Sequence, residues 1–200
     1  MTVIMVDVNS KRRGKGMGYS AADTAAKHER ILHEASRLFR ERGFSGVSVS
    51  EIMKASGLTH GPFYNHFSSK ERLMAEAVAH GVKRSLAKLD KLCGSPKGKT
   101  QYVKDYLCAA QRDAPGAGCT IAALSAEVRQ EPRLRGPFTV QLKALVQKLT
   151  DCLPGTSKRV SRGEAIRMLS SLVGAMILAR AVDDRAFSDQ ILREARKGFS

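Results

Sequence analysis

A short polar run after Gly57 carries the side chains best suited to chemistry in this 200-residue chain. It offers a hydroxyl, two imidazoles, a phenol and a glycine, from Thr59, His60, Gly61, Tyr64 and His66. Such groups donate hydrogen bonds to phosphate oxygens and base edges, and a glycine lets the backbone come close. No paired carboxylates, nucleophile with its base or metal-ligand cluster appears in the sequence. We therefore expect recognition of a polyanion, with no catalytic site, no metal and no cofactor.

Two helices joined by a glycine turn are expected to position this run. Ser48 and Glu51 have the spacing of a capping box, which predicts that a helix begins there. Gly57 is a typical left-handed stop for that helix. Thr59 is then expected to cap a second helix over residues 60–67. This is the pattern of a helix-turn-helix, whose second helix lies in the major groove of DNA.

The second helix is expected to have an inner and an outer face. Phe63 and Phe67 stand one turn apart and should face the core. The remaining side chains then face outward, and Lys70 follows as a further cation for phosphate. The residues expected to contact DNA are Ser48, Thr59, His60, Gly61, Tyr64, His66 and Lys70. The alternative is a helical hairpin inside a core, which explains the phenylalanines but not an outward Tyr64.

The region from Ile31 to Leu73 resembles the tetracycline-repressor (TetR) family of bacterial transcriptional regulators. The resemblance rests on Gly43-Phe44, Ser48-Val49, Glu51-Ile52, Gly61, Tyr64, His66-Phe67 and Ser69-Lys70-Glu71. Ser36, Met53 and Pro62 depart from the usual pattern, which affects the operator sequence and not the motif. The resemblance implies an all-α fold of about nine to ten helices, a homodimer, double-stranded operator DNA as partner, and control by a small molecule.

Net charge and the N-terminal segment agree with a polyanion partner. The formal net charge is +15, although +10 of it falls in residues 71–200, outside the predicted helix-turn-helix. Residues 1–22 hold several basic residues among glycines and predict a flexible arm. Arg12 and Arg13 of this arm are candidate DNA contacts. A tail with incidental charge is an equally good interpretation.

The composition also sets expectations about location and cysteine chemistry. No stretch reaches the ~18 apolar residues that a membrane helix needs, and the apolar start is too short for a signal peptide. We expect a soluble, cytoplasmic protein without a membrane partner. Its cysteines are expected to be reduced, mostly buried, and not metal ligands; they are Cys93, Cys108, Cys119 and Cys152.

Everything after the motif is predicted to be helical. The helix preceding the motif is expected at 24–43, and those following it at 71–92, 101–112, 120–129, 132–153, 161–182 and 188–197. We expect a possible break at Gly136-Pro137 and Ser188 as the last N-cap. This gives three units: a basic arm (1–22), a helix-turn-helix domain (23–70), and a larger helical ligand-binding and dimerisation domain (71–200).

The last two predicted helices are expected to form half of a four-helix dimer bundle. The helix at 161–182 is the most hydrophobic and carries small residues that allow close approach. The expected interface residues are Leu169, Leu172, Gly174, Met176 and Ile191. Burial of the same helix inside its own domain is the alternative, and only the family resemblance favours the dimer.

An apolar or aromatic effector is expected to bind between the long helix and the helices at 101–112 and 134–153. The candidate ligand-binding residues are Tyr102, Tyr106, Cys119, Phe138 and Leu142. Such a site needs a cavity of about 300 Å³ or more. The sequence thus predicts a homodimeric repressor released from its operator by a small molecule. The alternative is a helical interaction protein or a nonspecific nucleic-acid binder without effector control.

Overall fold

The computed structural model describes residues 21–153 and 161–199, and every regular element in these ranges is a helix. The elements are α1 (Ala21–Arg42), α2 (Val49–Ala55), the 3-10 segment η1 (Gly61–Asn65), α3 (Lys70–Asp90), α4 (Gly98–Tyr106), α5 (Ala109–Asp113), the 3-10 segment η2 (Pro115–Ala117), α6 (Thr120–Val128), α7 (Pro132–Cys152), α8 (Arg162–Ala181) and α9 (Arg185–Lys197). The predicted all-α class is confirmed. The predicted arm falls mainly on residues 1–20, outside the described residues.

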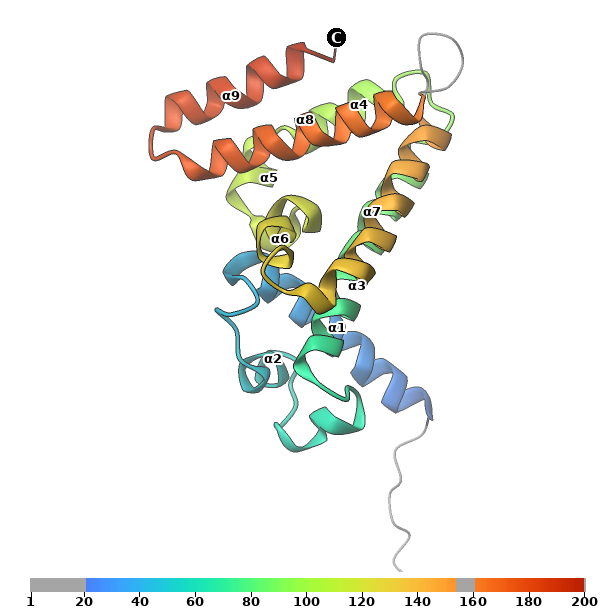
Figure 1. Cartoon of the computed structure of the whole chain (residues 1–200), viewed down its shortest axis with the longest axis vertical. Coiled ribbons are helices and arrows are strands. Elements are labelled where there is room, and N and C mark those ends of the chain that lie inside the picture. The colour runs from blue at the N-terminus through green and yellow to red at the C-terminus, as the bar shows by residue number, and fades with distance from the viewer. Residues whose placement is uncertain (1–20, 154–160, 200) are drawn as a thin grey trace, which may run out of the picture.

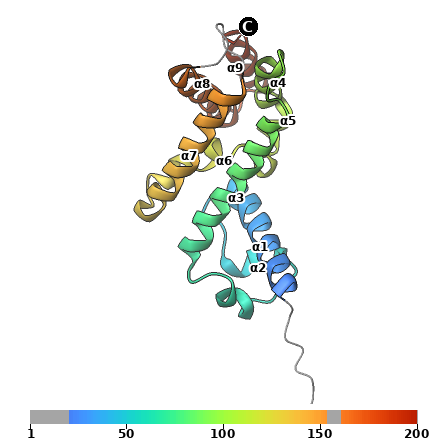
Figure 2. The ribbon, with the colours of Figure 1, turned by 90° about the vertical axis from the view of Figure 1, so that its right-hand side faces the viewer.

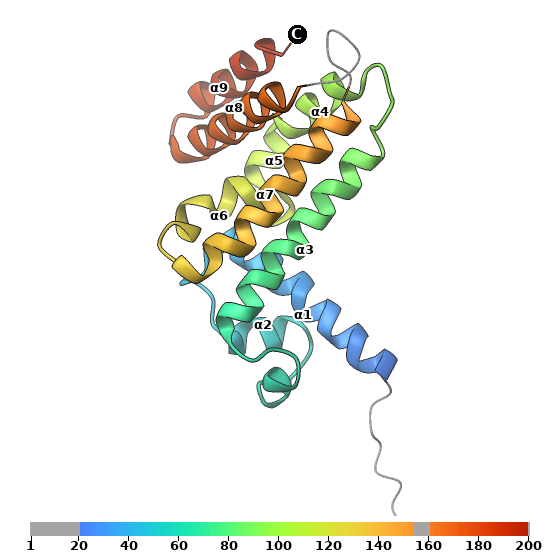
Figure 3. The same cartoon turned by 45° about the vertical axis from the view of Figure 1, so that its right-hand side comes forward.

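Two long helices connect the two ends of the molecule. α3 and α7 lie side by side, as Figure 3 shows. The N-terminal helices α1 and α2 lie at one end, and α4, α8 and α9 lie at the other (Figures 1 and 2). α6 occupies the middle, against α1, α3, α7 and α8. A change at the C-terminal end can therefore reach the N-terminal end through α3 or α6.

The N-terminal end has an aromatic core that also draws on distant helices. Phe63 and Phe67 are buried in it, as predicted, each 2% exposed. The same cluster contains three apolar side chains from α6 and α7, Leu124, Val128 and Leu134. Because these residues lie beyond position 71, the boundary that we place at residue 70 stays a proposal. A second cluster holds α4, α8 and the outer parts of α3 and α7 together.

Three predicted helix boundaries change. The single helix expected at 101–112 is two helices, because the backbone leaves the helical region at Leu107 (φ −91°, ψ 58°) and at Cys108 (φ −126°, ψ 159°). α7 is continuous through Pro137, which removes only one hydrogen bond close to the helix start. The cap of α9 is Asp184, whose carboxylate accepts the N–H of Phe187 at 3.0 Å.

Ser188 is therefore not a helix cap, and the prediction that it caps the last helix is wrong. Asp184 stands one turn earlier and caps the helix first. Ser188 is buried, and its hydroxyl donates to the carbonyl of Ala179 at 2.6 Å. The same hydroxyl accepts a hydrogen bond from Arg112 at 2.8 Å. It joins α9 to α8 and α5.

A disulfide links Cys93, just beyond α3, to Cys152 at the end of α7, 59 positions further along the sequence. The expectation of four reduced cysteines is wrong for this pair, while Cys108 and Cys119 are free. The pairing has no local sequence signal, since it depends on α3 and α7 ending at the same place. It ties together the two long helices at the end opposite the helix-turn-helix.

Within the described ranges, none of the helices combines the length and the hydropathy that crossing a bilayer requires.

Candidate nucleic-acid interface and ligand pocket

The predicted capping box at the start of α2 is confirmed. The hydroxyl of Ser48 accepts the N–H of Glu51 at 3.2 Å, and the carboxylate of Glu51 accepts the N–H of Ser48 at 2.8 Å. The side chain of Arg42 also donates to the Glu51 carboxylate, at 2.8 Å. The hydrogen bond from the Ser48 backbone, followed by the one from Arg42, lowers the pKa of Glu51 to about 2. The Ser48 hydroxyl also donates to the same carboxylate. Its contact with a DNA phosphate stays a prediction.

The second element of the motif is shorter than predicted. Residues 61–65 form a 3-10 segment instead of an α-helix over 60–67. Pro62 has no N–H to donate, and the N–H of Phe63 bonds the carbonyl of His60, three residues back. No side chain caps this segment, so the prediction that Thr59 is its N-cap is wrong.

The outer face of the motif matches the predicted arrangement. Tyr64 is 70% exposed beside the buried Phe63. Thr59, His60 and Gly61 are exposed as well, and a side chain at position 61 would meet no atom. These four residues form one accessible surface, which we call the reading surface. That this surface contacts DNA remains a prediction.

His66 is less accessible than predicted. Its ring is half-buried beside that of His28, with the ring centres 5.8 Å apart, and the His28 ring stacks on Phe67 at 4.6 Å. Burial, followed by the nearby His28 and Lys27, lowers the pKa of His66. The imidazole of His66 is therefore mostly neutral at pH 7, when it can donate through only one ring nitrogen.

Lys70 holds the backbone that precedes the motif. Its ammonium donates to the carbonyl of Phe44 at 2.8 Å and to that of Val47 at 2.7 Å. Two of its three N–H groups are thus used inside the protein, and one is left for a phosphate. The residue has a structural role that its sequence position did not indicate. Arg12 and Arg13, the other predicted cationic contacts, lie outside the described residues.

We expect Lys70→Met to lower the free energy of unfolding by about 1–2 kcal/mol, since two carbonyls lose a charged donor. If the third N–H holds a phosphate, the slope of log affinity against log salt also shrinks by about one unit. Urea unfolding and DNA titrations at several salt concentrations measure the two effects. Lys54→Met on the exposed side of α2 is the control for stability. Unchanged stability of Lys70→Met would contradict the anchoring role.

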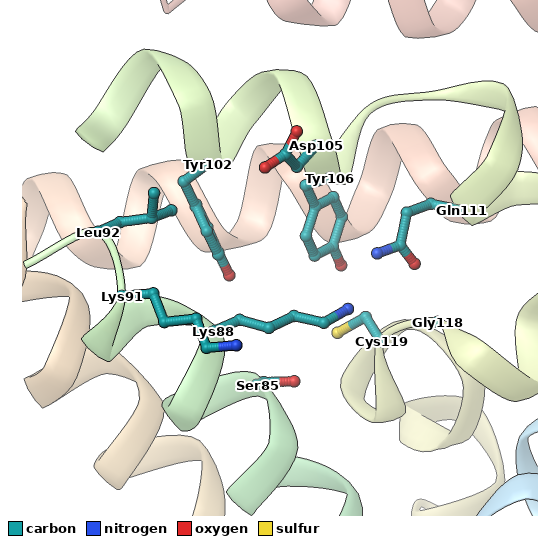
Figure 4. A pocket seen from close by; sticks show the side chains of 10 residues that line it. All are labelled: Ser85, Lys88, Lys91, Leu92, Tyr102, Asp105, Tyr106, Gln111, Gly118 and Cys119. Atoms are coloured by element: carbon teal, nitrogen blue, oxygen red, sulfur yellow. The ribbon is translucent and has the colours of Figure 1, made fainter. Parts of the chain in front are cut away.

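A cavity of about 360 Å³ lies between α3, α4, α5 and the start of α6. It is lined by Ser85, Lys88, Lys91, Leu92, Tyr102, Asp105, Tyr106, Gln111, Gly118 and Cys119 (Figure 4). The two tyrosines and Cys119 come together as predicted. Phe138 and Leu142 do not line the cavity, because both pack in the apolar cluster beside it. The site is therefore bounded by α5 and the end of α3, and not by α7.

Sequence reasoning missed the polar part of the cavity. Lys88 and Lys91 lie three residues apart near the end of α3 and share one face of it. That spacing is a signal, but lysines on a long helix are usually solvated and so carry little weight. Both phenols are deeply buried, and burial raises the pKa of Tyr102 and of Tyr106. They therefore stay protonated at neutral pH and can donate hydrogen bonds.

A buried arginine joins α1 to the segment that borders the cavity. The Nε of Arg40 donates to the carbonyl of Gly116 at 2.9 Å, and its Nη1 donates to Ser36 at 2.5 Å and to Thr120 at 3.4 Å. Burial lowers the pKa of Arg40 to about 10, so it remains charged at neutral pH. Gly81 of α3 packs so close to this cluster that a Cβ there would clash. We call these five residues the arginine junction.

A second contact joins α6 to the turn between α1 and α2. The N–H of Phe44 donates to the carboxylate of Glu127 in α6 at 2.5 Å. Glu127 also crowds Gly43, whose φ of 75° favours glycine. α6 thus touches the turn that leads into α2, while Gly118 and Cys119, the two residues just before α6, line the cavity.

The predicted dimer residues occupy two different environments. Leu169, Leu172 and Met176 are at most 4% exposed within the single chain, so placing them in a dimer interface is wrong. They belong to the second core together with residues of α4, α7 and α9, and burial inside the same chain was the alternative interpretation. Gly174 is half-buried with open space beside it, and Ile191 is half-buried.

The exposed apolar side chains of this end lie elsewhere on the same helices. They are Ile166, Ile177, Leu178 and Phe187, all between 41% and 58% exposed. On α8, Ile166, Gly174 and Ile177 recur at helical spacing and share one side. Leu178 stands one turn after Gly174 and borders the same side. We call the side formed by Ile166, Gly174, Ile177 and Leu178, together with Phe187, the outer face of α8 and α9.

Known proteins share both the motif and the fold. The sequence profile of the family described as "Bacterial regulatory proteins, tetR family" matches residues 31–77. An uncharacterized HTH-type transcriptional regulator of Mycobacterium tuberculosis is 26% identical over 84% of this chain and 91% of its own length. The transcriptional repressor DhaR of a Mycobacterium species is 27% identical, over 50% of this chain and 51% of its own length. Escherichia coli NemR in its reduced form has a similar fold, with a TM-score of 0.71, 21% identity, and coverage of 88% of this chain and 95% of NemR.

Proposed function

We propose that the chain, which belongs to the TetR family of DNA-binding transcriptional regulators, is a homodimeric repressor released from its operator by a small molecule. The members of this family are not enzymes. The observation that carries the proposal is the arginine junction. It connects the helix in front of the helix-turn-helix to the segment that lines the cavity.

The reading surface is proposed to enter the major groove of operator DNA. Exposed Tyr64 and the open backbone at Gly61 support this, since both can approach base edges closely. Two copies related by a twofold axis would read half-sites about 34–36 Å apart or somewhat more. The net charge of +15 adds attraction to the duplex that does not depend on sequence.

We expect Tyr64→Ala to weaken operator binding about tenfold, which corresponds to about 1.4 kcal/mol. The unfolding free energy should change by no more than about 0.5 kcal/mol, because the side chain is 70% exposed. Tyr64→Phe, tested in parallel, separates the hydroxyl from the ring. A sharp fall in melting temperature in Tyr64→Ala would instead place the ring in the core.

The dimer is proposed to form through the outer face of α8 and α9. Its exposed apolar side chains gain from burial, and the open space at Gly174 allows a partner helix to approach. Soluble regulators of palindromic sites match the twofold symmetry of their DNA with their own.

Leu178→Glu should convert the dimer to monomers at micromolar concentration, because it would bury an unpaired carboxylate. Val140→Glu is the matched control, since Val140 of α7 is also an exposed apolar residue (62%) but lies off this face. Sedimentation velocity reads out both variants. A monomeric wild-type protein, or a Leu178→Glu variant that stays dimeric, would rule out this interface.

Ligand release is proposed to work through differential affinity. A molecule in the cavity touches Gly118 and Cys119, which follow Gly116 by only two and three residues. A shift of this segment changes where Arg40 holds α1, and so changes the distance between the two reading surfaces. The ligand can do this only if it binds the released conformation more tightly than the operator-bound one.

A salt titration that compares the promoter of its own gene with random DNA of equal length tests the proposal. We expect the promoter to bind more tightly by about 10³-fold or more at physiological salt. Equal affinity for both would instead favour a nonspecific nucleic-acid binder without effector control.

A further inference from the structure

The cavity contains a buried polar group without a partner. The Tyr106 hydroxyl makes no hydrogen bond to a nitrogen or oxygen atom of any described residue, and its polar side-chain neighbour is the Cys119 thiol, a weak partner, although Tyr106 is only 7% exposed. An unsatisfied buried hydroxyl is destabilising, so native proteins usually satisfy it with protein, water or ligand. Burial raises the pKa of Tyr106, which keeps the proton on its oxygen at neutral pH. The group is therefore available as a donor to a bound acceptor.

Positive charge faces this donor from the opposite wall. Figure 4 shows the two phenol rings extending from α4 toward the lysine side chains of α3, and Lys88 extending along the cavity toward Cys119. In the described part of the chain, no carboxylate lies within salt-bridge distance of Lys88 or Lys91. Two ammonium groups and one orphaned phenol thus converge on the same space.

The cavity lining carries less negative than positive charge, and its carboxylate already accepts a hydrogen bond. Asp105 is the one carboxylate among its lining residues, and it accepts a hydrogen bond from Gln101 at 2.7 Å. An adjoining cavity of about 430 Å³ shares Lys88 and Asp105, and it adds Lys104 and Arg196. The local field therefore favours an anion over a cation.

The rest of the lining suits an apolar body. The rings of Tyr102 and Tyr106 and the side chain of Leu92 supply an apolar part of the lining. A volume of about 360 Å³ is in the range of sites for small organic molecules. A fully polar anion such as free phosphate would leave this part of the lining uncovered.

We propose that the cavity binds an organic carboxylate, with its apolar body against the two tyrosine rings and its carboxylate held by Lys88, Lys91 and the Tyr106 hydroxyl. This inference rests on the proposed ligand control and narrows it to one chemical class. It also assigns a role to three groups that the fold itself does not use.

The test compares carboxylates with matched neutral and cationic compounds. Phenyl, naphthyl and octyl bodies are each supplied as the carboxylate, the primary amide and the primary amine. Binding to the full-length protein is measured by calorimetry at pH 7. We expect at least one carboxylate to bind about tenfold or more tightly than its own amide, as one charge-assisted hydrogen bond implies, and every amine to bind more weakly still.

Variants then locate the carboxylate. Lys88→Met keeps the stem of the side chain and removes the charge, and should reduce the preference for carboxylate over amide about fivefold or more while leaving amide affinity unchanged. Tyr106→Phe should reduce the same preference several-fold. Lys83→Met is the matched control, since Lys83 is an exposed lysine of α3 that does not line the cavity. It should bind as the wild type does.

The outcomes separate the two proposals. Equal binding of carboxylate and amide, tighter binding of an amine, or no binding by any compound overturns the carboxylate assignment, even if promoter binding is intact. A preference for carboxylate that is unchanged in Lys88→Met overturns it as well. If the carboxylate binds as expected but does not weaken promoter binding, the ligand class stands and ligand-controlled repression fails.

Discussion

Cys93→Ser is expected to lower the free energy of unfolding by about 4 kcal/mol. The disulfide closes a loop between two cysteines that stand 59 positions apart in sequence, and opening such a loop adds chain entropy of this size to the unfolded state. Cys93 is the better position to change because it is exposed, whereas Cys152 is buried and its replacement would also disturb packing. Urea unfolding of the oxidised protein gives the value.

The control for this experiment is Cys108→Ser, which removes a free and half-exposed thiol and should leave stability within about 0.5 kcal/mol of the wild type. Dithiothreitol should reproduce the loss in the wild type and have no effect on Cys93→Ser. If the wild type and Cys93→Ser unfold at the same urea concentration under oxidising conditions, the cross-link is absent from the folded protein in solution.

Arg40→Met should cost about 2–3 kcal/mol of stability and also weaken the coupling between cavity and DNA. Methionine retains the apolar stem, but the buried carbonyl of Gly116 loses its charged donor. Ser36 and Thr120 lose a partner at the same time. Urea unfolding measures the first effect, and promoter binding with and without a bound cavity ligand measures the second.

Arg37→Met is the matched control one turn earlier on α1. Arg37 pairs with Glu34 and Glu41 at the surface, and such pairs contribute about 0–1 kcal/mol. This variant should therefore unfold close to the wild type and respond normally to ligand. Unchanged stability of Arg40→Met would mean that other groups can replace the hydrogen bonds of Arg40. A normal response of promoter binding to the ligand would exclude Arg40 from the proposed coupling between cavity and DNA.

Local signals in the sequence were sufficient to predict the start of α2 and the buried side of the helix-turn-helix. The capping box of Ser48 and Glu51 spans three residues, and the burial of Phe63 and Phe67 follows from one helical turn. The same logic misjudged Thr59, because Pro62 changes how the first turn forms its hydrogen bonds. The choice between an α-helix and a 3-10 segment depends on backbone geometry, which the pattern of side chains does not reveal.

Features that depend on distant segments were not predictable in this way. Arg40 is buried only because Gly116 and Thr120 lie beside α1, 76 and 80 residues away in sequence. The pairing of Cys93 with Cys152 has the same origin. Hydrophobic periodicity likewise shows that one face of α8 is buried, but it does not show whether that face packs against the same chain or against a second copy. Leu169 and Leu172 pack within the same chain.

The shared core of the N-terminal end has a consequence for biosynthesis. A nascent chain that has emerged from the ribosome only as far as residue 100 contains all of α1, α2 and α3. It lacks Leu124, Val128 and Leu134, which complete the aromatic core around Phe39 and Phe67. Until α6 and the start of α7 have been synthesised, that apolar surface stays open to water and to other nascent chains. The segment proposed to recognise DNA is thus among the first parts made, yet its core closes only when about two thirds of the chain exists.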